Sequence, residues 1–460
     1  MSPDTRAPAA PGDDRLLSGW GGTAPTRARV ATPVDERDVS NFLDIAPDRG
    51  VIARGLGRAY GDAAQNSGGL VLDTNALSGI REVDLEHGAV TAGAGTSLDA
   101  LMHWLVPRGW FVPVTPGTRS VTVGGAIASD VHGKNHHIDG TFGAHVSAMT
   151  LRTGAGSTLQ LTPDETPAEF WATAGGMGLT GVILDATFDL IPIETSLIEV
   201  HDERCRDLDE MMRLMSEGDS GYRYSVAWID CLARGTSLGR GLLGRGNHAP
   251  LEALTPRQRE HALRFDARPI AMAPRFVPSG MVNGFTMRAF NELWFQKGRL
   301  RHGTTLQTIG AYFHILDLVE DWNRMYGRRG FVQYQCVIPD GEEEALRVVV
   351  ERLSGSGIAS FLAVLKRFGA ENPGMLSFPK PGWTLALDMP VGNGDLWRLL
   401  DRVDDVVLEA NGRVYLSKDA RTKPEHLPAM YPRLDEWRAV RDSLDPEHVI
   451  TSDLARRLGL

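Results

Sequence analysis

Three glycine-rich stretches lie within about 85 residues of the N-terminal third, and their composition suits a phosphate-bearing cofactor. They are residues 54–62 (RGLGRAYGD), 93–97 (GAGTS) and 116–137 (PGTRSVTVGGAIASDVHGKNHH). Glycine lets the backbone approach a ligand closely and exposes N–H groups that bind anions. Each stretch alone is more typical of a structural turn, or of two strands with bulges. Together they favour a long cofactor that carries a pyrophosphate.

A further glycine motif, residues 176–181 (GMGLTG), matches the dinucleotide pattern G-x-G-x-x-G in the wrong context. That fingerprint requires a strand before it and a helix after it. Here residues 167–173 favour a helix and residues 182–190 favour a strand, so the order is reversed. The sequence therefore argues against a nicotinamide-binding Rossmann domain.

The elements expected around these stretches are short strands, a helix and a hairpin. Strands are predicted at residues 51–53, 70–73 and 89–92, a helix capped by Thr96 or Ser97 at 98–106, and a hairpin at 146–161. Beyond about residue 193, strands such as 224–229 and 331–338 alternate with helices such as 343–353, and an amphipathic helix is expected at 434–444. This alternation predicts an antiparallel sheet with helices on one face.

The composition excludes several classes of protein. With 48 basic and 58 acidic residues in 460, the chain has a net charge of −10, so nucleic acid is not an expected partner. No run of 18 apolar residues occurs, so no membrane-spanning helix is expected. The three cysteines, Cys205, Cys231 and Cys336, are widely spaced, which argues against disulfides and zinc. His136 and His137 are adjacent and would point apart on a strand, so we expect no metal site.

Two segments differ from the rest of the chain. Residues 1–17 are rich in proline, alanine and charge, which predicts a disordered leader without the apolar core of a signal peptide. Residues 268–303 contain six basic residues against one acid, Glu292, with apolar and aromatic residues between them. This segment is either an ordinary surface excursion or a mobile lid that meets an anionic lipid or a phosphate-bearing substrate.

Motifs from about residue 18 to the C-terminus resemble those of one enzyme family. They are GWG at 19–21, ARGLGRAYGD at 53–62, PGTRSVTVGGAIASDVHGKNHH at 116–137, FWATAGGMGLTG at 170–181, FVQYQCVIP at 331–339, YLSKDART at 415–422, YPRLDEW at 431–437 and SDLARRL at 452–458. The chain resembles the FAD-dependent decaprenylphosphoryl-β-D-ribose 2′-oxidases of actinobacteria, within the wider group of vanillyl-alcohol oxidases and aldonolactone oxidases. The HGKNHH and SKDART segments are the most specific.

The resemblance implies an α+β fold in which a substrate domain, built on an antiparallel sheet, is inserted into an FAD-binding domain of the vanillyl-alcohol oxidase type. The expected division is a leader at 1–17, the FAD-binding domain at 18–195, the substrate domain at 196–411 with its mobile segment at 268–303, and a C-terminal part of the FAD-binding domain at 412–460. The change in glycine density near residue 195 agrees with this division.

The resemblance also implies which residues hold FAD. The expected contacts are Ala53, Arg54, Gly55, Leu56, Gly57, Arg58, Ala59, Tyr60, Gly61, Asp62, Ala63, Gly117, Thr118, Thr122, Val123, Gly124, Gly125, Ser129, His132, Gly133, Lys134, Asn135, Ile183 and Tyr415. In many relatives a histidine in the first loop links covalently to the flavin. Arg58 occupies that position here, so FAD is expected to bind without a covalent bond.

Lys418 is expected to be the central catalytic residue, with His132 and Tyr60 beside it. A lysine near flavin either stabilises the anion of the reduced cofactor or, with a lowered pKa, acts as a base, and the sequence does not separate these roles. The expected substrate contacts are Trp228, Gln335, Lys366, Ala386 and Lys418. Ala386 stands where mycobacterial members carry a cysteine, so thiol-directed inhibitors should fail on this chain.

The implied reaction oxidises the C2′ hydroxyl of a polyprenylphosphoryl ribose, the first half of a ribose-to-arabinose epimerisation for cell-wall arabinan. The expected partners are the sugar lipid, an NADH-dependent short-chain reductase and a membrane surface. Family members act at the cell envelope, while the absence of a visible signal peptide leaves the cytoplasm as the alternative. Two other hypotheses stay open: an oxidase of a soluble aldonolactone, alditol or sugar nucleotide, and a non-catalytic flavoprotein.

Overall fold

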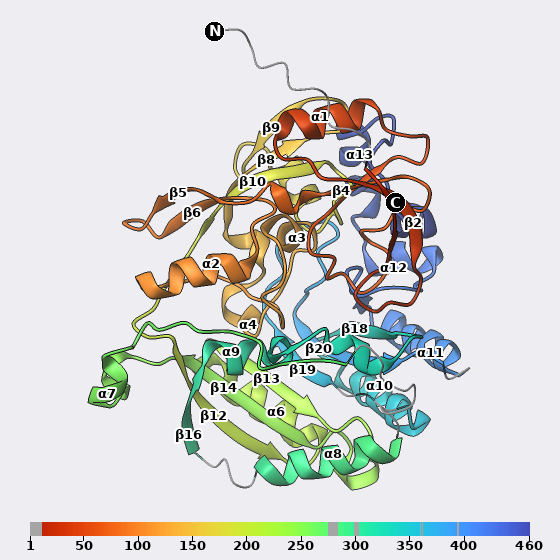
Figure 1. The fold of residues 1–460 in the computed structure, drawn as a ribbon. Helices are drawn as coiled ribbons and strands as arrows, with labels where there is room; N and C mark the ends of the chain where they lie inside the picture. Colours follow the sequence, from red (N-terminus) through yellow and green to blue (C-terminus); the bar gives the residue numbers. More distant parts are fainter. Residues whose placement is uncertain (1–11, 275–283, 299–302, 359, 361, 393–394) are drawn as a thin grey trace.

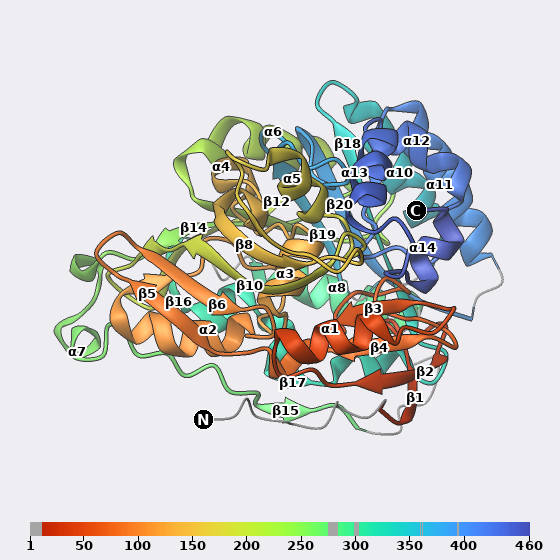
Figure 2. The same cartoon turned by 90° about the horizontal axis from the view of Figure 1, so that it is seen from above.

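The computed structural model describes residues 12–274, 284–298, 303–358, 360, 362–392 and 395–460 (Figure 1). Two smaller sheets with their helices form the upper part of the molecule in Figure 1, and one large sheet forms the lower part. Chain segments cross between the two parts more than once, because C-terminal elements pack back on the N-terminal third (Figure 2). Among the described residues, no helix has both the length and the apolar character needed to cross a membrane.

The first small sheet has the order β1-β2-β4-β3, with parallel pairing on both sides of β4. Its strands are β1 (Asp14–Leu17), β2 (Thr26–Ala31), β3 (Val51–Arg54) and β4 (Leu70–Asp73). Helix α1 (Glu36–Asp44) connects β2 to β3, and the Asp35 side chain accepts a hydrogen bond from the Asp38 N–H at its start. The loop that follows β3 carries the first glycine-rich stretch.

The second small sheet is antiparallel throughout and has the order β5-β6-β10-β8-β9. Its strands are β5 (Ile80–Asp84), β6 (Ala89–Gly93), β8 (Val146–Arg152), β9 (Thr158–Leu161) and β10 (Val182–Asp189). Helix α2 (Leu98–Leu105) begins at Ser97, whose side chain accepts from the Ala100 N–H, as predicted. Helix α5 (Pro167–Thr173) precedes the G-x-G-x-x-G motif and β10 follows it, which confirms the order that argues against a Rossmann domain.

Three sequence-based interpretations need correction. Residues 14–17 of the expected disordered leader form β1, because their backbone pairs with β2, while residues 1–11 lie outside the described part of the chain. The stretch Val123–Ala128 is helix α3 rather than part of a strand pair, since the Thr122 side chain caps it through the Gly125 N–H. His136 and His137 lie on helix α4 (His136–Asp139), not on a strand.

The large sheet has eight strands in the order β16-β12-β14-β13-β19-β20-β18-β21, and all of its pairings are antiparallel. The strands are β12 (Leu197–Cys205), β13 (Tyr224–Ile229), β14 (Gly241–His248), β16 (Gly303–Thr308), β18 (Phe331–Pro339), β19 (Ala363–Phe368), β20 (Gly382–Pro390) and β21 (Arg413–Val414). Helices α6 (Leu208–Gly218), α10 (Glu343–Ser356) and α11 (Leu396–Glu409) pack on it. This confirms the expected antiparallel sheet, and these three helices cover one of its faces.

Successive side chains of each strand point to opposite faces of this sheet, and the two faces have different surroundings. Leu243, Leu365 and Leu385 are fully buried in the core that includes α6, α10 and α11. Their sequence neighbours Leu242, Val364 and Ala386 point to the opposite face, where they line a cavity. The face of the large sheet opposite α6, α10 and α11 therefore forms one wall of that cavity.

The C-terminal segment joins the two parts of the molecule. Its first strand, β21, pairs with β18 and so extends the large sheet, although the sequence division assigned residue 412 onward to the FAD-binding part. Helix α13 (Leu434–Leu444) then packs on α5, and the Trp437 indole N–H donates to the Ala172 carbonyl at 3.0 Å. The loop between β21 and the C-terminal helices is thereby held between both parts.

The remaining elements include helix α8, which has 14 residues, and several shorter helices and strands. They are β7 (Trp110–Phe111), β11 (Ile191–Pro192), β15 (Ala271–Met272), β17 (Val319–Glu320), α7 (Pro256–Arg259), α8 (Gly284–Lys297), α9 (Ile309–Phe313), α12 (Leu427–Met430) and α14 (Asp453–Leu458).

Candidate active site

A cavity of about 790 Å³ lies between the glycine-rich segments and the face of the large sheet opposite α6, α10 and α11. This volume is within the range of about 300–1,000 Å³ that small-molecule and cofactor sites occupy. The cavity extends from the loop after β3, past α3, to α8 and the strands β12, β13 and β14. One continuous space therefore connects the expected cofactor loops with the expected substrate residues.

The loop after β3 is suited to bind an anion through its backbone. From Gly55 to Ala59, no backbone N–H donates to a protein acceptor among the described residues. Gly57 has a φ of +65°, and a Cβ on Gly55 would meet the Thr122 hydroxyl at 2.2 Å. Five consecutive N–H groups that lack protein partners on a cavity wall fit the pyrophosphate of FAD.

Most of the residues expected to hold FAD line this cavity. They are Ala53, Gly55, Leu56, Gly57, Arg58, Ala59, Tyr60, Ala63, Gly117, Thr118, Thr122, Gly124, Gly125, Ser129, His132, Gly133, Lys134, Ile183 and Tyr415. Their individual contacts with FAD stay predictions.

The other five expected FAD contacts do not line the cavity, because the protein itself engages them. Arg54 donates to the Ala64 and Ser18 carbonyls, at 2.9 and 2.8 Å. Gly61 lies against the Asp419 carbonyl, where a Cβ would approach within 1.8 Å, and Asp62 accepts two hydrogen bonds from Arg457. Val123 is fully buried, and the Asn135 amide donates to the Pro113 carbonyl. These residues therefore support the segments that line the cavity through contacts within the protein.

Arg58 occupies the position at which many relatives carry a flavin-linked histidine, and it is fixed by other contacts. Its guanidinium lies 3.8 Å from the centre of the Trp20 ring, and its Nε donates to the Ser120 carbonyl at 3.2 Å. A guanidinium does not form the covalent bond that histidine forms with flavin. We therefore expect acid precipitation to release all FAD into the supernatant. Yellow colour or flavin fluorescence retained on the denatured chain would contradict this prediction.

Lys418 lies in the loop after β21 and faces the cavity. Its ammonium group donates to the Gln333 side-chain oxygen and lies 4.2 Å from the centre of the Tyr60 ring. Burial lowers the pKa of Lys418 to about 8, and the Asp388 carboxylate opposes part of this shift. The side chain therefore exchanges a proton close to neutral pH, unlike an exposed lysine.

Gln333 and Asp388 complete the surroundings of Lys418, and the sequence analysis did not single them out. The Gln333 amide nitrogen donates to an Asp388 carboxylate oxygen and to the Tyr60 hydroxyl, the latter at 3.1 Å. Asp388 is fully buried, and burial raises its pKa. Each of the two is a polar residue inside an otherwise apolar strand sequence, FVQYQCVIP or WTLALDMP, and this could have indicated a functional role. The pairing of the two strands, which places Gln333 opposite Asp388, is visible only in the structure.

His132 lies at the same wall of the cavity and is neutral. Burial, followed by the positive charge of Lys366, holds the pKa of His132 well below its usual value. Its Nε2 lies 2.9 Å from the Gln335 amide nitrogen, which assigns the acceptor role to Nε2 and the proton to Nδ1. Its ring packs against Phe368, 4.8 Å away, and Tyr415, 5.2 Å away. His132, Gln335 and Lys418 therefore present polar groups to one end of the cavity.

The expected substrate residues all line the cavity and come from adjacent strands. Trp228 lies on β13, Lys366 on β19, Ala386 on β20 and Gln335 on β18. The cysteines lie elsewhere: all three are buried, and burial raises the pKa of Cys336 to about 12. No described cysteine lines the cavity, in agreement with the expectation from Ala386.

The adjacent histidines His136 and His137 and the basic segment 268–303 were both considered in the sequence. His136 accepts from the Gly369 N–H, and the described residues contain no group of three potential metal ligands.

Of the segment 268–303, residues 275–283 and 299–302 lie outside the described part of the chain. Residues 284–297 form helix α8, whose Phe290 and Trp294 line the cavity.

Comparisons with known proteins agree with this geometry. Residues 27–162 match the family model described as FAD binding domain, and residues 392–458 match that of D-arabinono-1,4-lactone oxidase. A decaprenylphosphoryl-β-D-ribose oxidase of Mycolicibacterium smegmatis is 44% identical over 456 residues, which cover 98% of each chain. An L-gulono-1,4-lactone dehydrogenase of Mycobacterium tuberculosis is 23% identical over 457 residues, 96% of this chain and 99% of the relative.

Proposed function

The chain belongs to the decaprenylphosphoryl-β-D-ribose oxidase family of FAD-binding oxidoreductases, and on this premise we propose that it oxidises the C2′ hydroxyl of a polyprenylphosphoryl ribose to a ketone. The observation that carries the proposal is the position of Lys418. It lies with His132 and Gln335 at one end of a cavity whose other wall is the glycine-rich loop with unpartnered N–H groups. A sugar hydroxyl at that end lies between a proton acceptor and the cofactor site.

The oxidation removes a hydride from C2′ and a proton from its hydroxyl group. Bound FAD supplies the acceptor for the hydride. Lys418 in its amine form takes the proton, and Gln333 together with Asp388 holds that side chain in place. His132 and Gln335 hold each other at the sugar end of the cavity through a hydrogen bond, and Phe368 and Tyr415 pack against the imidazole ring.

The proposal is tested by anaerobic mixing of the purified yellow protein with a short-chain prenylphosphoryl ribose. Rapid bleaching of the flavin absorbance would support the proposed half-reaction. The match of residues 392–458 to an aldonolactone oxidase model keeps a soluble substrate as the second candidate. Bleaching by an aldonolactone or alditol, with none by the prenylphosphoryl sugar, would move the assignment to that candidate. A flavin that no sugar reduces would favour a non-catalytic role.

The rate of flavin reduction should depend on pH through Lys418. Below a pKa of about 8 the side chain is protonated and cannot accept the hydroxyl proton, so the rate should rise as the pH increases from 6.5 to 9. The expected slope is roughly tenfold per pH unit below the pKa, and the rate should level off above it. Stopped-flow reduction across this range is the measurement. A rate that falls over the same interval would assign Lys418 the role of a cation that stabilises reduced flavin.

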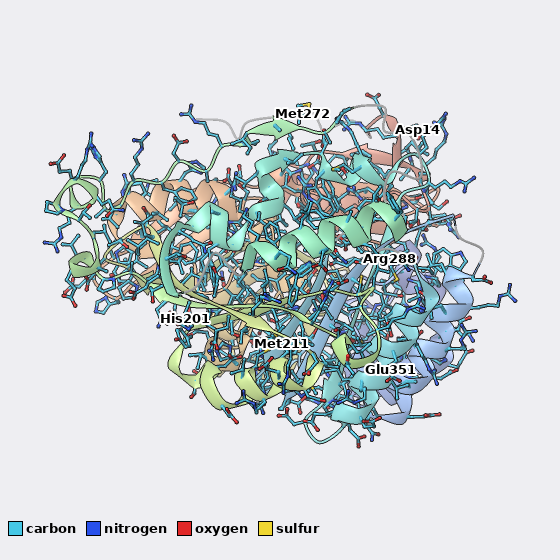
Figure 3. All side chains as sticks on the ribbon, turned by 90° about the horizontal axis from the view of Figure 1, so that it is seen from below. Asp14, His201, Met211, Met272, Arg288 and Glu351 are labelled. Carbon is cyan, nitrogen blue, oxygen red and sulfur yellow. The ribbon has the colours of Figure 1, made fainter. Side chains whose placement is uncertain are left out.

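We also propose that the substrate lipid brings the protein to a membrane surface at the cell envelope. Ile270, Phe285 and Leu293 are 79%, 83% and 73% exposed. Phe285 and Leu293 lie on helix α8 together with Arg288, which Figure 3 labels, and Lys297, while Ile270 precedes this helix in the chain. Exposed apolar groups beside cations suit peripheral contact with anionic lipid.

The 2′-keto product requires a reductase to complete an epimerisation, and an NADH-dependent short-chain reductase is the proposed partner.

This membrane contact predicts co-sedimentation with anionic vesicles. The wild-type protein should bind vesicles that contain phosphatidylglycerol and dissociate as salt rises, because the attraction is partly electrostatic. The double variant Phe285→Ser, Leu293→Ser should lose most of this binding, while a Leu16→Ser change at another exposed apolar position should not. Equal sedimentation of all three proteins would remove this surface from the proposal.

A further inference from the structure

The cavity face of the large sheet changes from polar to cationic to apolar along the order of its strands. In the pairing register, Gln335 opposes Ala386, Ala386 opposes Val364, Val364 opposes Trp228, and Trp228 opposes Leu242. Directly opposed residues in antiparallel strands point to the same face, so these five side chains form one row. The row begins with an amide beside His132 and ends in two large apolar groups on β13 and β14.

Lys366 lies in the adjacent row, between the polar and apolar ends. It opposes Thr384 on β20. Among the described residues its ammonium group has no hydrogen-bond acceptor and no carboxylate within ion-pair distance. Burial lowers the pKa of Lys366 to about 7, and the positive charges of Lys418 and Lys134 lower it further. A cation in this position, facing a cavity and repelled by two others, would be stabilised by a bound anion.

Lys134 differs from Lys366, whose ammonium group lies 5.9 Å from the centre of the Phe368 ring, because Lys134 also has a hydrogen-bond acceptor. Its ammonium group donates to the Tyr312 carbonyl and lies 3.9 Å from the centre of the Tyr312 ring. Asp202 also lines the cavity and raises the pKa of Lys134 against the effect of burial. An anion next to Lys134 would approach the Asp202 carboxylate. Lys366 is therefore the better position for a negatively charged group.

The strands beyond Lys366 form an apolar trough. Val226, Trp228 and Leu242 line its floor, and Phe290 and Trp294 of α8 line its roof. α8 is held close to the floor, since a Cβ on Gly298 would come within 2.3 Å of the Leu242 side chain. Figure 3 labels Arg288 on α8 and His201 on β12, the strand that pairs with β14. The trough is continuous with the polar end of the same cavity.

We propose that the substrate lies across the strands of the large sheet, with its phosphate on Lys366 and its prenyl chain in the trough beneath α8. This inference rests on the proposed function and deepens it. The sugar then occupies the end that contains Gln335, His132 and Lys418, and strand β20 separates Gln335 on β18 from the phosphate on β19. The order sugar, phosphate, lipid in the substrate matches the order amide, cation, apolar floor along the sheet.

The test uses the FAD-loaded protein and a prenylphosphoryl 2-deoxyribose, which lacks the hydroxyl to be oxidised and therefore reports binding alone. Its dissociation constant is read from the change in flavin absorbance on titration. Lys366→Met should weaken binding by about 10- to 100-fold, the usual range for loss of a charge-assisted hydrogen bond, and Lys366→Arg should restore much of it. Lys423→Met, at an exposed position, is the matched control. Equal affinity of Lys366→Met and wild type would overturn the phosphate assignment.

A series of analogues with increasing numbers of prenyl units tests the trough. In the wild type, affinity should rise with chain length until the trough is filled, because each buried CH₂ group adds favourable transfer energy. Leu242→Asn on the floor and Trp294→Ser on the roof should reduce this gain by about tenfold for the longest chain and leave the shortest analogue unaffected. A gain that is identical in wild type and both variants would place the lipid elsewhere.

Failure of this inference can be distinguished from failure of the proposed function. If prenylphosphoryl ribose reduces the flavin in wild type while the variants bind every analogue normally, only the inferred orientation is wrong. If no prenylphosphoryl ribose reduces the wild-type flavin, the proposed function itself fails.

Discussion

Replacing Lys418 by alanine should lower the rate of substrate-dependent flavin reduction by roughly 10³-fold or more, because general-base catalysis contributes about 10²–10⁴-fold and the positioning contact is lost as well. The Lys418 side chain is held by Gln333 and lies over the Tyr60 ring, and the alanine variant loses both contacts together with the amine. FAD should stay bound, since the loop of unpartnered N–H groups from Gly55 to Ala59 is untouched. Single-turnover stopped-flow absorbance measures the rate, and the ratio of flavin to protein absorbance measures the occupancy.

Two comparisons make the Lys418 result interpretable. Lys423→Ala, at an exposed position five residues further on, should behave as wild type. Lys418→Arg keeps a positive charge but does not lose a proton near neutral pH. If arginine restores most of the rate, the charge rather than the basicity of Lys418 is what the reaction needs. Near-normal reduction in the alanine variant would remove Lys418 from the chemistry altogether.

Replacing Trp437 by alanine should destabilise the protein by about 3–5 kcal/mol, the usual cost of deleting a fully buried aromatic side chain. Trp437 is 0% exposed, and its indole N–H donates to the Ala172 carbonyl of α5. The variant removes both the packing and the hydrogen bond that attach the C-terminal segment to the N-terminal third. The free energy of unfolding, obtained from urea titration of the holoprotein, is the measurement.

The matched control for this prediction is Trp397→Ala on α11. That side chain is 38% exposed, so its truncation should cost much less, within about 1 kcal/mol. FAD should also dissociate more readily from the Trp437 variant, because the loop that carries Lys418 lies between β21 and the C-terminal helices. Equal unfolding free energies for the two variants would show that the C-terminal segment does not hold the FAD-binding part together.

Local structure was predictable where it depends on neighbours in the chain. The hairpin of β8 and β9, the start of α2 at Ser97 and the bounds of α13 all follow from periodicity, capping residues and turn residues. The prediction of a disordered leader up to residue 17 was wrong, because strand β1 depends on pairing with β2. Helix α3 was not predicted; Thr122 caps it, although its two glycines have low helix propensity.

The arrangement around Lys418 depends on contacts between distant parts of the chain. Gln333, Asp388 and Tyr60 come from two neighbouring strands and a glycine-rich loop, and no local pattern indicates that they meet. The same is true of Arg54 and Asp62. Both lie in the motif that suggested cofactor contacts, yet Arg54 binds main-chain carbonyls and Asp62 pairs with Arg457. A motif identifies a loop, but the packing behind the loop decides which of its side chains face the ligand.

Residue types and their spacing indicated the chemistry of this protein: glycine-rich loops for a phosphate-bearing cofactor, a lysine in a specific motif, and strand patterns for a large antiparallel sheet. The arrangement of these groups in space follows from the folded chain. The register of the eight strands places Gln335, Lys366 and Trp228 in order along one cavity, and burial brings the pKa of Lys418 to about 8. The reason is physical, because register and desolvation are properties of elements far apart in the chain that come together only on folding.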